Sequence, residues 1–283
     1  TSSIQMQRGL SAVNLATPSI GGTMNIITDP AALERGGSFK QELGAGAFLK
    51  STINYNTGLI ADKYAFSTTL VKKTGDGIID GNWTDAYAYY LGSSYQMNDA
   101  NRFELFAIGA PQRHGQNLYK QNASAYSQEF ELNYSQEALE AYPEASHGEG
   151  GRFYSQNWNN VSESYTGQQY WYMYGARTVD RYKKDILNER ENFFHKPLVN
   201  LNHYLTLNDK MNLSSIVYWS GGSGGGTGTY DNDCATYDST SMEWVKNTGS
   251  GGFIWDYSGP SRLADWDANI AMNAGTEDRK GGV

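Results

Sequence analysis

The clearest pattern in the chain is a set of segments in which apolar and polar residues alternate with a period of two. From Ser38 onward, Phe39, Leu43, Ala45 and Ala47 share one face, and small or charged residues take the other. Similar alternation recurs at 52–57, 64–70, 87–97, 102–110, 198–207 and 211–219. This period is typical of β-strands that have one apolar and one wet face. The sequence therefore predicts an all-β fold with about seven antiparallel strands.

The connections between these segments alternate in length. Short polar breaks at 61–63, 98–101 and 208–210 predict tight hairpins. The intervening connections are longer and occupy 74–84, 111–196 and the residues from 220 to the end. Short turns at one end and long loops at the other are typical of outer-membrane barrels, whose long loops face outside. The pattern therefore favours a partial transmembrane antiparallel β-barrel with long extracellular loops.

Composition narrows the possible partners. The formal net charge is −8, so we expect no nucleic-acid partner. No stretch approaches about 18 consecutive apolar residues, which excludes transmembrane helices from the sequence prediction. Aromatic residues make up 13% of the chain, and Tyr and Trp concentrate at membrane interfaces and ligand surfaces. These features do not rule out a membrane β-barrel, whose strands need only alternate, and such a barrel would contact outer-membrane lipid.

The sequence shows no pattern that is typical of an enzyme active site. His114, His147, His195 and His203 lack the spacing of a metal site, and Cys234 is the single cysteine. No serine lies in a Gly-x-Ser-x-Gly elbow. Acidic pairs in the loops are interpreted as solvated surface. We therefore predict no catalytic residues, no metal site and no cofactor.

The long loop at 111–196 is rich in aromatic residues, which argues against disorder. Rings at a pore mouth present flat faces with polar tips and suit the binding of a small nutrient. The candidate ligand-binding residues are Phe153, Tyr154, Trp158, Tyr165, Tyr170, Trp171, Tyr172 and Tyr174. The alternative, given equal weight, is that these rings pack the loop against itself. A weaker second group comprises Trp244, Phe253, Trp255, Tyr257 and Trp266.

Local patterns in the loops give three further predictions. Residues 135–141 and 179–191 are candidate short helices. The glycine-rich segment 221–228 lacks the Gly-Lys-Ser/Thr ending of a phosphate-binding loop, and no helix pattern follows it. It is therefore predicted to be a flexible loop.

The N-terminal segment carries the most specific motif. A strand-like run, Ile4-Gln5-Met6-Gln7-Arg8-Gly9-Leu10, is followed by Gly21-Gly22 and then by Thr23-Met24-Asn25-Ile26-Ile27-Thr28. The glycine pair opens the second run at a point where close backbone approach or a positive φ angle would exclude a side chain. Together these residues closely resemble the last strands of the plug domain of TonB-dependent outer-membrane receptors.

This resemblance implies both a domain organisation and a function. Residues 1–33 would be the C-terminal end of a plug domain, and 34–283 the N-terminal part of the receptor barrel, with extracellular loops at about 111–196 and 220–283. Such receptors lie in the outer membrane of Gram-negative bacteria, bind a scarce nutrient outside and import it when TonB pulls on the plug. The ligand would be a siderophore, cobalamin or an oligosaccharide-like molecule.

The resemblance also implies roles for the plug residues Arg8, Gly9, Gly21, Gly22 and Asn25. Arg8 would pair with a carboxylate inside the barrel, and the glycines would permit a tight strand entry. The inner-membrane TonB complex would act through an N-terminal part missing from this chain, which is interpreted as a fragment that lacks both ends.

Two other classes of protein stay open at this stage. The first is a secreted or surface all-β lectin whose aromatic loops hold a glycan, which requires the apolar faces of its strands to pack against each other. The second is a glycosidase, which requires two loop carboxylates at catalytic separation in a cleft.

Overall fold

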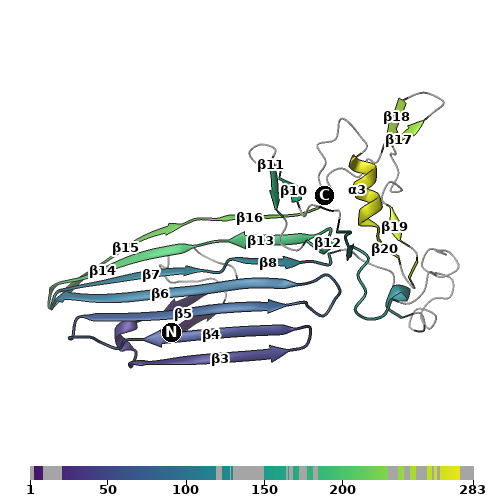
Figure 1. Ribbon diagram of the computed structural model, residues 1–283. Helices are drawn as coiled ribbons and strands as arrows, with labels where there is room; N and C mark the ends of the chain where they lie inside the picture. Colours follow the sequence, from purple (N-terminus) through teal and green to yellow (C-terminus); the bar gives the residue numbers. More distant parts are fainter. Residues whose placement is uncertain are drawn as a thin grey trace.

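The largest unit of the protein is a long antiparallel sheet (Figure 1). The computed structural model describes residues 3–8, 21–118, 123–127, 129, 150–163, 165, 168–171, 177–180, 184–228, 235–238, 243–246, 254–256, 258–259 and 262–274. The main strands, in spatial order, are β15 (Met211–Ser220), β14 (Leu198–Asn208), β7 (Asn101–Gly109), β6 (Thr84–Asn98), β5 (Tyr64–Gly75), β4 (Phe48–Asn56) and β3 (Gly36–Gly44).

These seven strands are the seven that the alternation predicts, and the all-β antiparallel fold class is confirmed. Within the described residues, β3 and β15 form the two edges of the main path, so the sheet is not closed into a barrel. The predicted short breaks all lie at one end, to the left in Figure 1. At the opposite end the connection 76–83 is longer, whereas Ala45–Ala47, predicted to extend the first strand, form a tight turn.

Three shorter strands lengthen the sheet beyond the predicted limits. After a break at 110–111, β7 is continued by β8 (Gln112–Gly115), which pairs with β6 and with β13 (Glu191–His195). A second break at 196–197 separates β13 from β14, and β16 (Ser223–Gly226) pairs with β13. The segment predicted to be a flexible glycine loop therefore contributes a strand. A Cβ atom at Gly224 would lie 2.7 Å from the carbonyl oxygen of Phe193, so glycine permits this close pairing.

The helix predicted at 179–191 is wrong. Its ends belong to β11 (Arg177–Asp180) and β13, and β12 (Ile186–Asn188) lies between them. The charged residues of this segment suggested a helix, but strand pairing with β9 (Trp158–Asn160) satisfies the backbone of β12 instead. The other candidate helix, 135–141, lies outside the described residues.

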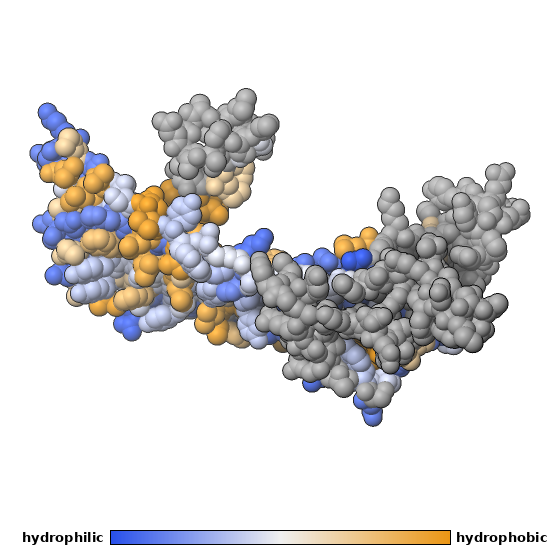
Figure 2. All heavy atoms as spheres, turned by 90° about the horizontal axis from the view of Figure 1, so that it is seen from above, coloured by the Kyte–Doolittle hydropathy of each residue, from blue (hydrophilic) through white to orange (hydrophobic). Residues whose placement is uncertain are grey.

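Alternation along the main strands separates an apolar face from a polar one. Strand register places Phe66, Ser93, Leu105, Leu201 and Val217 in one row across five strands. The four apolar residues of this row, Phe66, Leu105, Leu201 and Val217, are 50%, 47%, 43% and 67% exposed. Hydrophobic residues gather over the turn-bearing part of the sheet, at the left of Figure 2. This distribution is the reverse of that in a water-soluble protein, because the apolar side chains face outward.

The opposite, polar face is the buried one. Its side chains include Ser67, Ser94, Glu104 and Asn202, each less than 9% exposed. Register places Ser94, Glu104 and Asn202 in one row across β6, β7 and β14. A sheet with an exposed apolar face and a buried polar face matches the wall of a membrane barrel with a polar interior.

The N-terminal segment forms a separate hairpin. Strands β1 (Ser3–Arg8) and β2 (Gly22–Ile27) pair in antiparallel register, with Arg8 opposite Gly22. The 3₁₀ turn η1 (Pro30–Ala32) follows and contacts β5 and β6 of the main sheet. The chain thus passes from the hairpin to the wall of the sheet through η1.

The loop end of the sheet carries a small folded unit. Its core consists of Leu187, Ala264 and Trp266, against which Val161, Tyr165, Trp255 and Ile270 pack. The core joins β9 and β12 to β19 (Trp255–Asp256), β20 (Leu263–Ala264) and α3 (Trp266–Ala274). We call this assembly the loop unit.

Other short elements lie among the loops: η2 (Ala123–Ala125), β10 (Gln168–Trp171) paired with β11, and β17 (Ala235–Asp238) paired with β18 (Glu243–Lys246). Among the described residues, no helix has both the length and the apolar character needed to cross a membrane.

Candidate functional site: the junction and the loop unit

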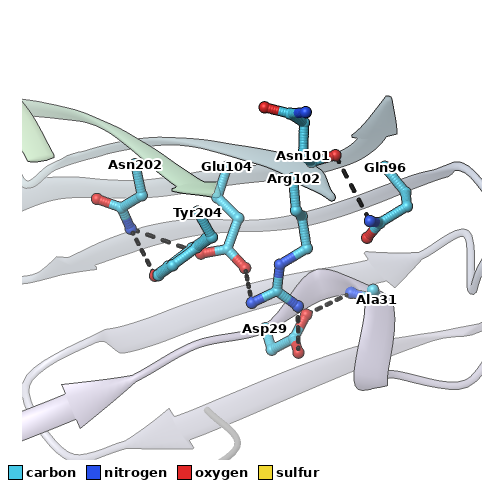
Figure 3. Close-up of polar contacts among 8 residues, drawn as sticks. All are labelled: Asp29, Ala31, Gln96, Asn101, Arg102, Glu104, Asn202 and Tyr204. Atoms are coloured by element: carbon cyan, nitrogen blue, oxygen red, sulfur yellow. Dashed lines mark hydrogen bonds and ion pairs between the residues drawn. The ribbon is translucent and has the colours of Figure 1, made fainter. Parts of the chain in front are cut away.

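The N-terminal segment is tied to the sheet by one arginine. Arg102, near the start of β7, places its Nη1 atom 3.6 Å from Oδ2 of Asp29 and its Nη2 atom 3.2 Å from Oε1 of Glu104 (Figure 3). Asp29 also caps η1, because its Oδ1 atom accepts a hydrogen bond of 2.9 Å from the backbone N–H of Ala31. One guanidinium therefore joins the segment that follows the hairpin to the wall of the sheet.

Residues of β14 complete this cluster. The side-chain amide of Asn202 donates hydrogen bonds to Oε2 of Glu104, at 3.5 Å, and to the hydroxyl of Tyr204, at 3.4 Å. The guanidinium of Arg102 lies 4.9 Å from the centroid of the Tyr204 ring. Glu104 is only 3% exposed, so its carboxylate depends on these partners. We refer to Asp29, Arg102, Glu104, Asn202 and Tyr204 as the junction cluster.

The junction cluster connects the segment after the β1–β2 hairpin to strands β7 and β14 through ion pairs and hydrogen bonds alone. Such contacts can break and form again without any covalent change. Sequence reasoning missed Arg102 and Glu104, although two charged residues two positions apart on one strand must share a face. That spacing was the available signal.

The structure describes only some of the plug residues predicted from the N-terminal motif. Gly22 begins β2 with a φ angle of 123°, a conformation that favours glycine. Gly21 precedes it, and a Cβ atom there would meet no atom within 4 Å. The backbone of Asn25 pairs with that of Gln5. The side chains of Arg8 and Asn25, and all of Gly9, lie outside the described residues, so the predicted pairing of Arg8 stays a prediction.

Of the candidate ligand-binding aromatics, Phe153 and Tyr154 lie in different surroundings. Phe153 is 42% exposed, and the guanidinium of Arg152 lies 4.5 Å from its ring centroid. Tyr154 is 6% exposed, and its hydroxyl donates a hydrogen bond of 2.5 Å to the carbonyl oxygen of Arg262. Tyr154 therefore packs the loop unit, whereas the ring of Phe153 is partly exposed beside Arg152.

The remaining candidates are spread over neighbouring strands. Trp158 is half-buried in β9, and Tyr165 packs against the core of the loop unit. Tyr170 and Trp171 lie in β10, where their backbones pair with Thr178 and Arg177. The side chains of Tyr170 and Trp171, and the whole of Tyr172 and Tyr174, lie outside the described residues. Ligand binding by this group of aromatics stays a prediction.

The weaker second group of aromatics is also placed in part. Trp266 is 2% exposed in the core of the loop unit, and the guanidinium of Arg262 lies 4.5 Å from the Trp255 ring centroid. Trp244 lies in β18, whereas Phe253 and Tyr257 are outside the described residues.

The loop unit is fastened to the sheet through the connection 76–83. The backbone N–H of Asp80 donates a hydrogen bond of 2.8 Å to the carbonyl oxygen of Phe153. The side-chain amide of Asn188 donates one of 3.0 Å to the carbonyl oxygen of Gly81. Phe153 and Asn188 are therefore each hydrogen-bonded to the connection 76–83.

The described residues contain no cluster of three or more His, Cys, Asp or Glu side chains that could hold a metal ion. Both regions are held by non-covalent contacts. The junction cluster contains ion pairs, and the loop unit contains contacts between aromatic rings and guanidinium groups.

Comparison with known proteins gives likeness in fold alone. No protein-family model matches the chain, and no curated protein matches it. The open form of the ferric-catecholate import receptor Fiu from E. coli K12 is similar over 78% of this chain, with 14% identity and a TM-score of 0.50. Its closed form is similar over 77% of the chain, with 14% identity and a TM-score of 0.49.

The chain spans only 28% of the open-form receptor chain and 26% of the closed-form chain. At this identity, the open-form match supports a receptor-like fold for the sheet and nothing finer. The expected receptor-like fold is thus supported, whereas the assignment of residues 1–33 to a plug domain stays a prediction.

Proposed function

We propose that this chain is part of an outer-membrane receptor that binds a scarce nutrient outside a Gram-negative cell and imports it. One observation carries the proposal: the sheet exposes its apolar face and buries its polar face, and the N-terminal segment is attached to that polar face. Lipid would cover the apolar face, and the polar face would line the interior of the barrel. The fold likeness to an import receptor supports the same assignment.

The proposed mechanism is binding and gated transport without covalent chemistry. The loop unit, with Phe153 open at its surface, would contribute to ligand affinity. The β1–β2 hairpin would belong to a plug that blocks the lumen until the TonB complex does work on it. A siderophore is the first ligand class to test, ahead of cobalamin and an oligosaccharide-like molecule, because the structure of similar fold is that of a ferric-catecholate import receptor.

The junction cluster would serve as the anchor of the plug in this mechanism. Arg102 holds Asp29 at the first turn after the hairpin, so the anchored point lies between the moving plug and the fixed wall. A force on the plug would therefore act on the Asp29–Arg102 ion pair before it acts on the other contacts of the junction cluster. The lectin alternative, by contrast, requires the apolar faces to pack together, whereas Phe66 and Val217 are 50% and 67% exposed.

Thiol labelling in intact cells tests the membrane topology. In a Cys234→Ser background of the protein that carries this chain, Arg152→Cys places a thiol in the loop unit and Asp62→Cys places one in a tight turn. We expect a membrane-impermeant maleimide to label Arg152→Cys in intact cells and Asp62→Cys only after the outer membrane is opened. Equal labelling of both positions in intact cells, or of neither, would contradict the proposal.

A further inference from the structure

A hollow of about 360 Å³ opens on the apolar face of the main sheet, across strands β4 to β7. Two neighbouring cross-strand rows line it: one contains Tyr55, Thr68, Leu91 and Ala107, and the other contains Phe66, Ser93 and Leu105. Thr68, Ser93 and Ala107 have short side chains, so the surface is recessed between the larger residues of both rows. Alternation along the strands puts both rows on the face that the proposed function assigns to lipid.

The chemistry of this hollow is apolar. None of the nine residues that line it is charged, and hydroxyl groups are the only polar groups of their side chains. The hydroxyl of Ser93 donates a hydrogen bond of 3.4 Å to the carbonyl oxygen of Leu105, so its donor is satisfied within the sheet. On the same face, Lys72 and Asp85 pair with each other nearer the loop end. The hollow therefore offers no charge to an ion and suits an uncharged, apolar occupant.

The position of the hollow along the strands specifies its depth in a membrane. The next row toward the turn end contains Tyr64, Tyr95 and Phe103, and Tyr64 stacks on Tyr95 with ring centroids 4.9 Å apart. Aromatic residues flank the apolar band of an outer-membrane barrel, which is about 25 Å tall. From Tyr95 to Ser93 and Leu91 the strand advances by about 7 and 13 Å, or about 5 and 10 Å along the membrane normal at a tilt of about 40°. The hollow therefore lies inside the apolar band, in the half nearer the turns.

We propose that the hollow holds an acyl chain of a phospholipid in the leaflet on the turn side. A recess of this volume takes a run of methylene groups, whereas an α-helix, about 10–12 Å wide with its side chains, does not enter it. Lipid tails are as apolar as leucine, so the gain comes from packing against Phe66, Leu91 and Leu105 and not from the exclusion of water. The inference rests on the proposed membrane location of the apolar face, but not on the identity of the nutrient.

Photo-crosslinking tests this site in the protein that carries this chain, reconstituted in vesicles of dioleoyl phosphatidylcholine. A small fraction of the phosphatidylcholine carries a photoreactive diazirine in the middle of one acyl chain, and peptide mass spectrometry counts the lipid adducts at each residue. Leu91 and Leu105 line the hollow, whereas Leu201 lies outside it in the row of Leu105. The three leucines are matched in exposure, at 49%, 47% and 43%. We expect about threefold more adducts on Leu91 and Leu105 than on Leu201, because the many small contacts within the hollow add up.

Variants that fill the hollow make the test specific. Ala107→Leu adds bulk between Leu91 and Leu105 and should reduce the excess of adducts on these two leucines from about threefold to about the level of Leu201. The matched control, Ser215→Leu, adds the same side chain on the same face outside the hollow and should leave the excess unchanged. Circular dichroism checks that each variant folds, and Ser93→Leu is a second filling variant with the same expected result.

The outcomes separate this inference from the proposed function. Equal adducts on all three leucines, or an excess that survives in both filling variants, would mean that lipid merely surrounds the sheet and that the hollow is not a site. If Ser93→Cys in a Cys234→Ser background forms disulfide-linked dimers on mild oxidation, a second copy covers the hollow and the lipid assignment is wrong. A protein without lipid adducts anywhere on the apolar face would contradict the membrane location itself.

Discussion

At the scale of single residues, Arg102 balances two carboxylates, those of Asp29 and Glu104. Removing it by Arg102→Ala leaves Glu104 buried without a cation, and breaking such a pair is destabilising. Because the Arg102 side chain is 34% exposed, solvent reduces this cost, and we expect a loss of about 2 kcal/mol in the free energy of unfolding. Urea unfolding in micelles, followed by tryptophan fluorescence, measures the change.

Two comparisons make this expectation specific to the junction cluster. Adding Glu104→Gln to Arg102→Ala removes the uncompensated charge and should restore part of the lost stability, as a double-mutant cycle will report. Lys63→Ala removes a cation from an exposed turn and should cost less than about 0.5 kcal/mol. If the effect of Arg102→Ala is no larger than that of Lys63→Ala, the ion pairs do not stabilise the junction.

Ala61 carries a second residue-scale prediction. It has a φ angle of 49° in the tight turn between β4 and β5, in the left-handed region that favours glycine. Relief of this strain, worth about 1–2 kcal/mol, exceeds the added chain entropy of glycine, worth about 0.5–1 kcal/mol. Ala61→Gly should therefore raise the free energy of unfolding by about 0.5–1 kcal/mol, measured by the same urea titration.

Ala45 supplies the control for this turn. It lies in the turn between β3 and β4 and is not among the described residues with a positive φ angle other than glycine, which are Ala47, Ala61 and Asp62. Ala45→Gly should therefore lower the stability slightly, because only the entropic cost applies. A stabilising effect at both alanines would mean that the gain does not come from the φ angle of Ala61.

At the scale of elements, alternation predicted the main strands well because each has one apolar face over six or more residues. It missed β8, β13 and β16, since these are short and lack a regular apolar face. In β16 the pairing depends on glycine backbone alone. The predicted helix at 179–191 failed because charged residues are compatible with helix and strand alike, and tertiary pairing with β9 decided between them.

Residues of the candidate site could be predicted only where a local sequence motif indicated them. The motif predicted a requirement for glycine at both Gly21 and Gly22. Gly22 has a φ angle of 123°, whereas Gly21 has no positive φ angle and a Cβ atom there would meet no atom within 4 Å. The junction cluster joins Asp29, β7 and β14, which are far apart in the sequence, so no local pattern specifies it. The burial of Tyr154 likewise depends on Arg262, more than a hundred residues away.

The two faces of the sheet give an element-scale prediction. Leu91 is 49% exposed on the apolar face, at the middle of β6 (Thr84–Asn98). Leu91→Arg would place a charge in lipid and should destabilise the folded chain in bilayers by about 2–4 kcal/mol. Val71→Arg, on the polar face of β5, should cost clearly less, because its guanidinium can reach the wet interior. Urea unfolding in lipid vesicles measures both, and equal costs would argue against a membrane-facing apolar surface.

At the scale of the whole molecule, two features determine how the chain behaves in water. The strands β3 and β15 are edges of the main sheet within the described residues, and each presents unpaired backbone groups. The apolar face adds exposed side chains such as Phe39 and Trp219, which are 66% and 60% exposed. Both features favour association in water, and detergent can cover only the second.

We therefore expect this 283-residue chain to aggregate in buffer without detergent and to disperse in micelles. Sedimentation velocity in the two conditions measures the difference. Pairing between edges should make residual association in micelles depend on protein concentration, and Lys substitutions at exposed β15 positions such as Ser215 should reduce it. A soluble monomer that melts cooperatively without detergent would instead require the apolar face to be covered by the chain itself, as in a lectin, and would contradict the receptor assignment.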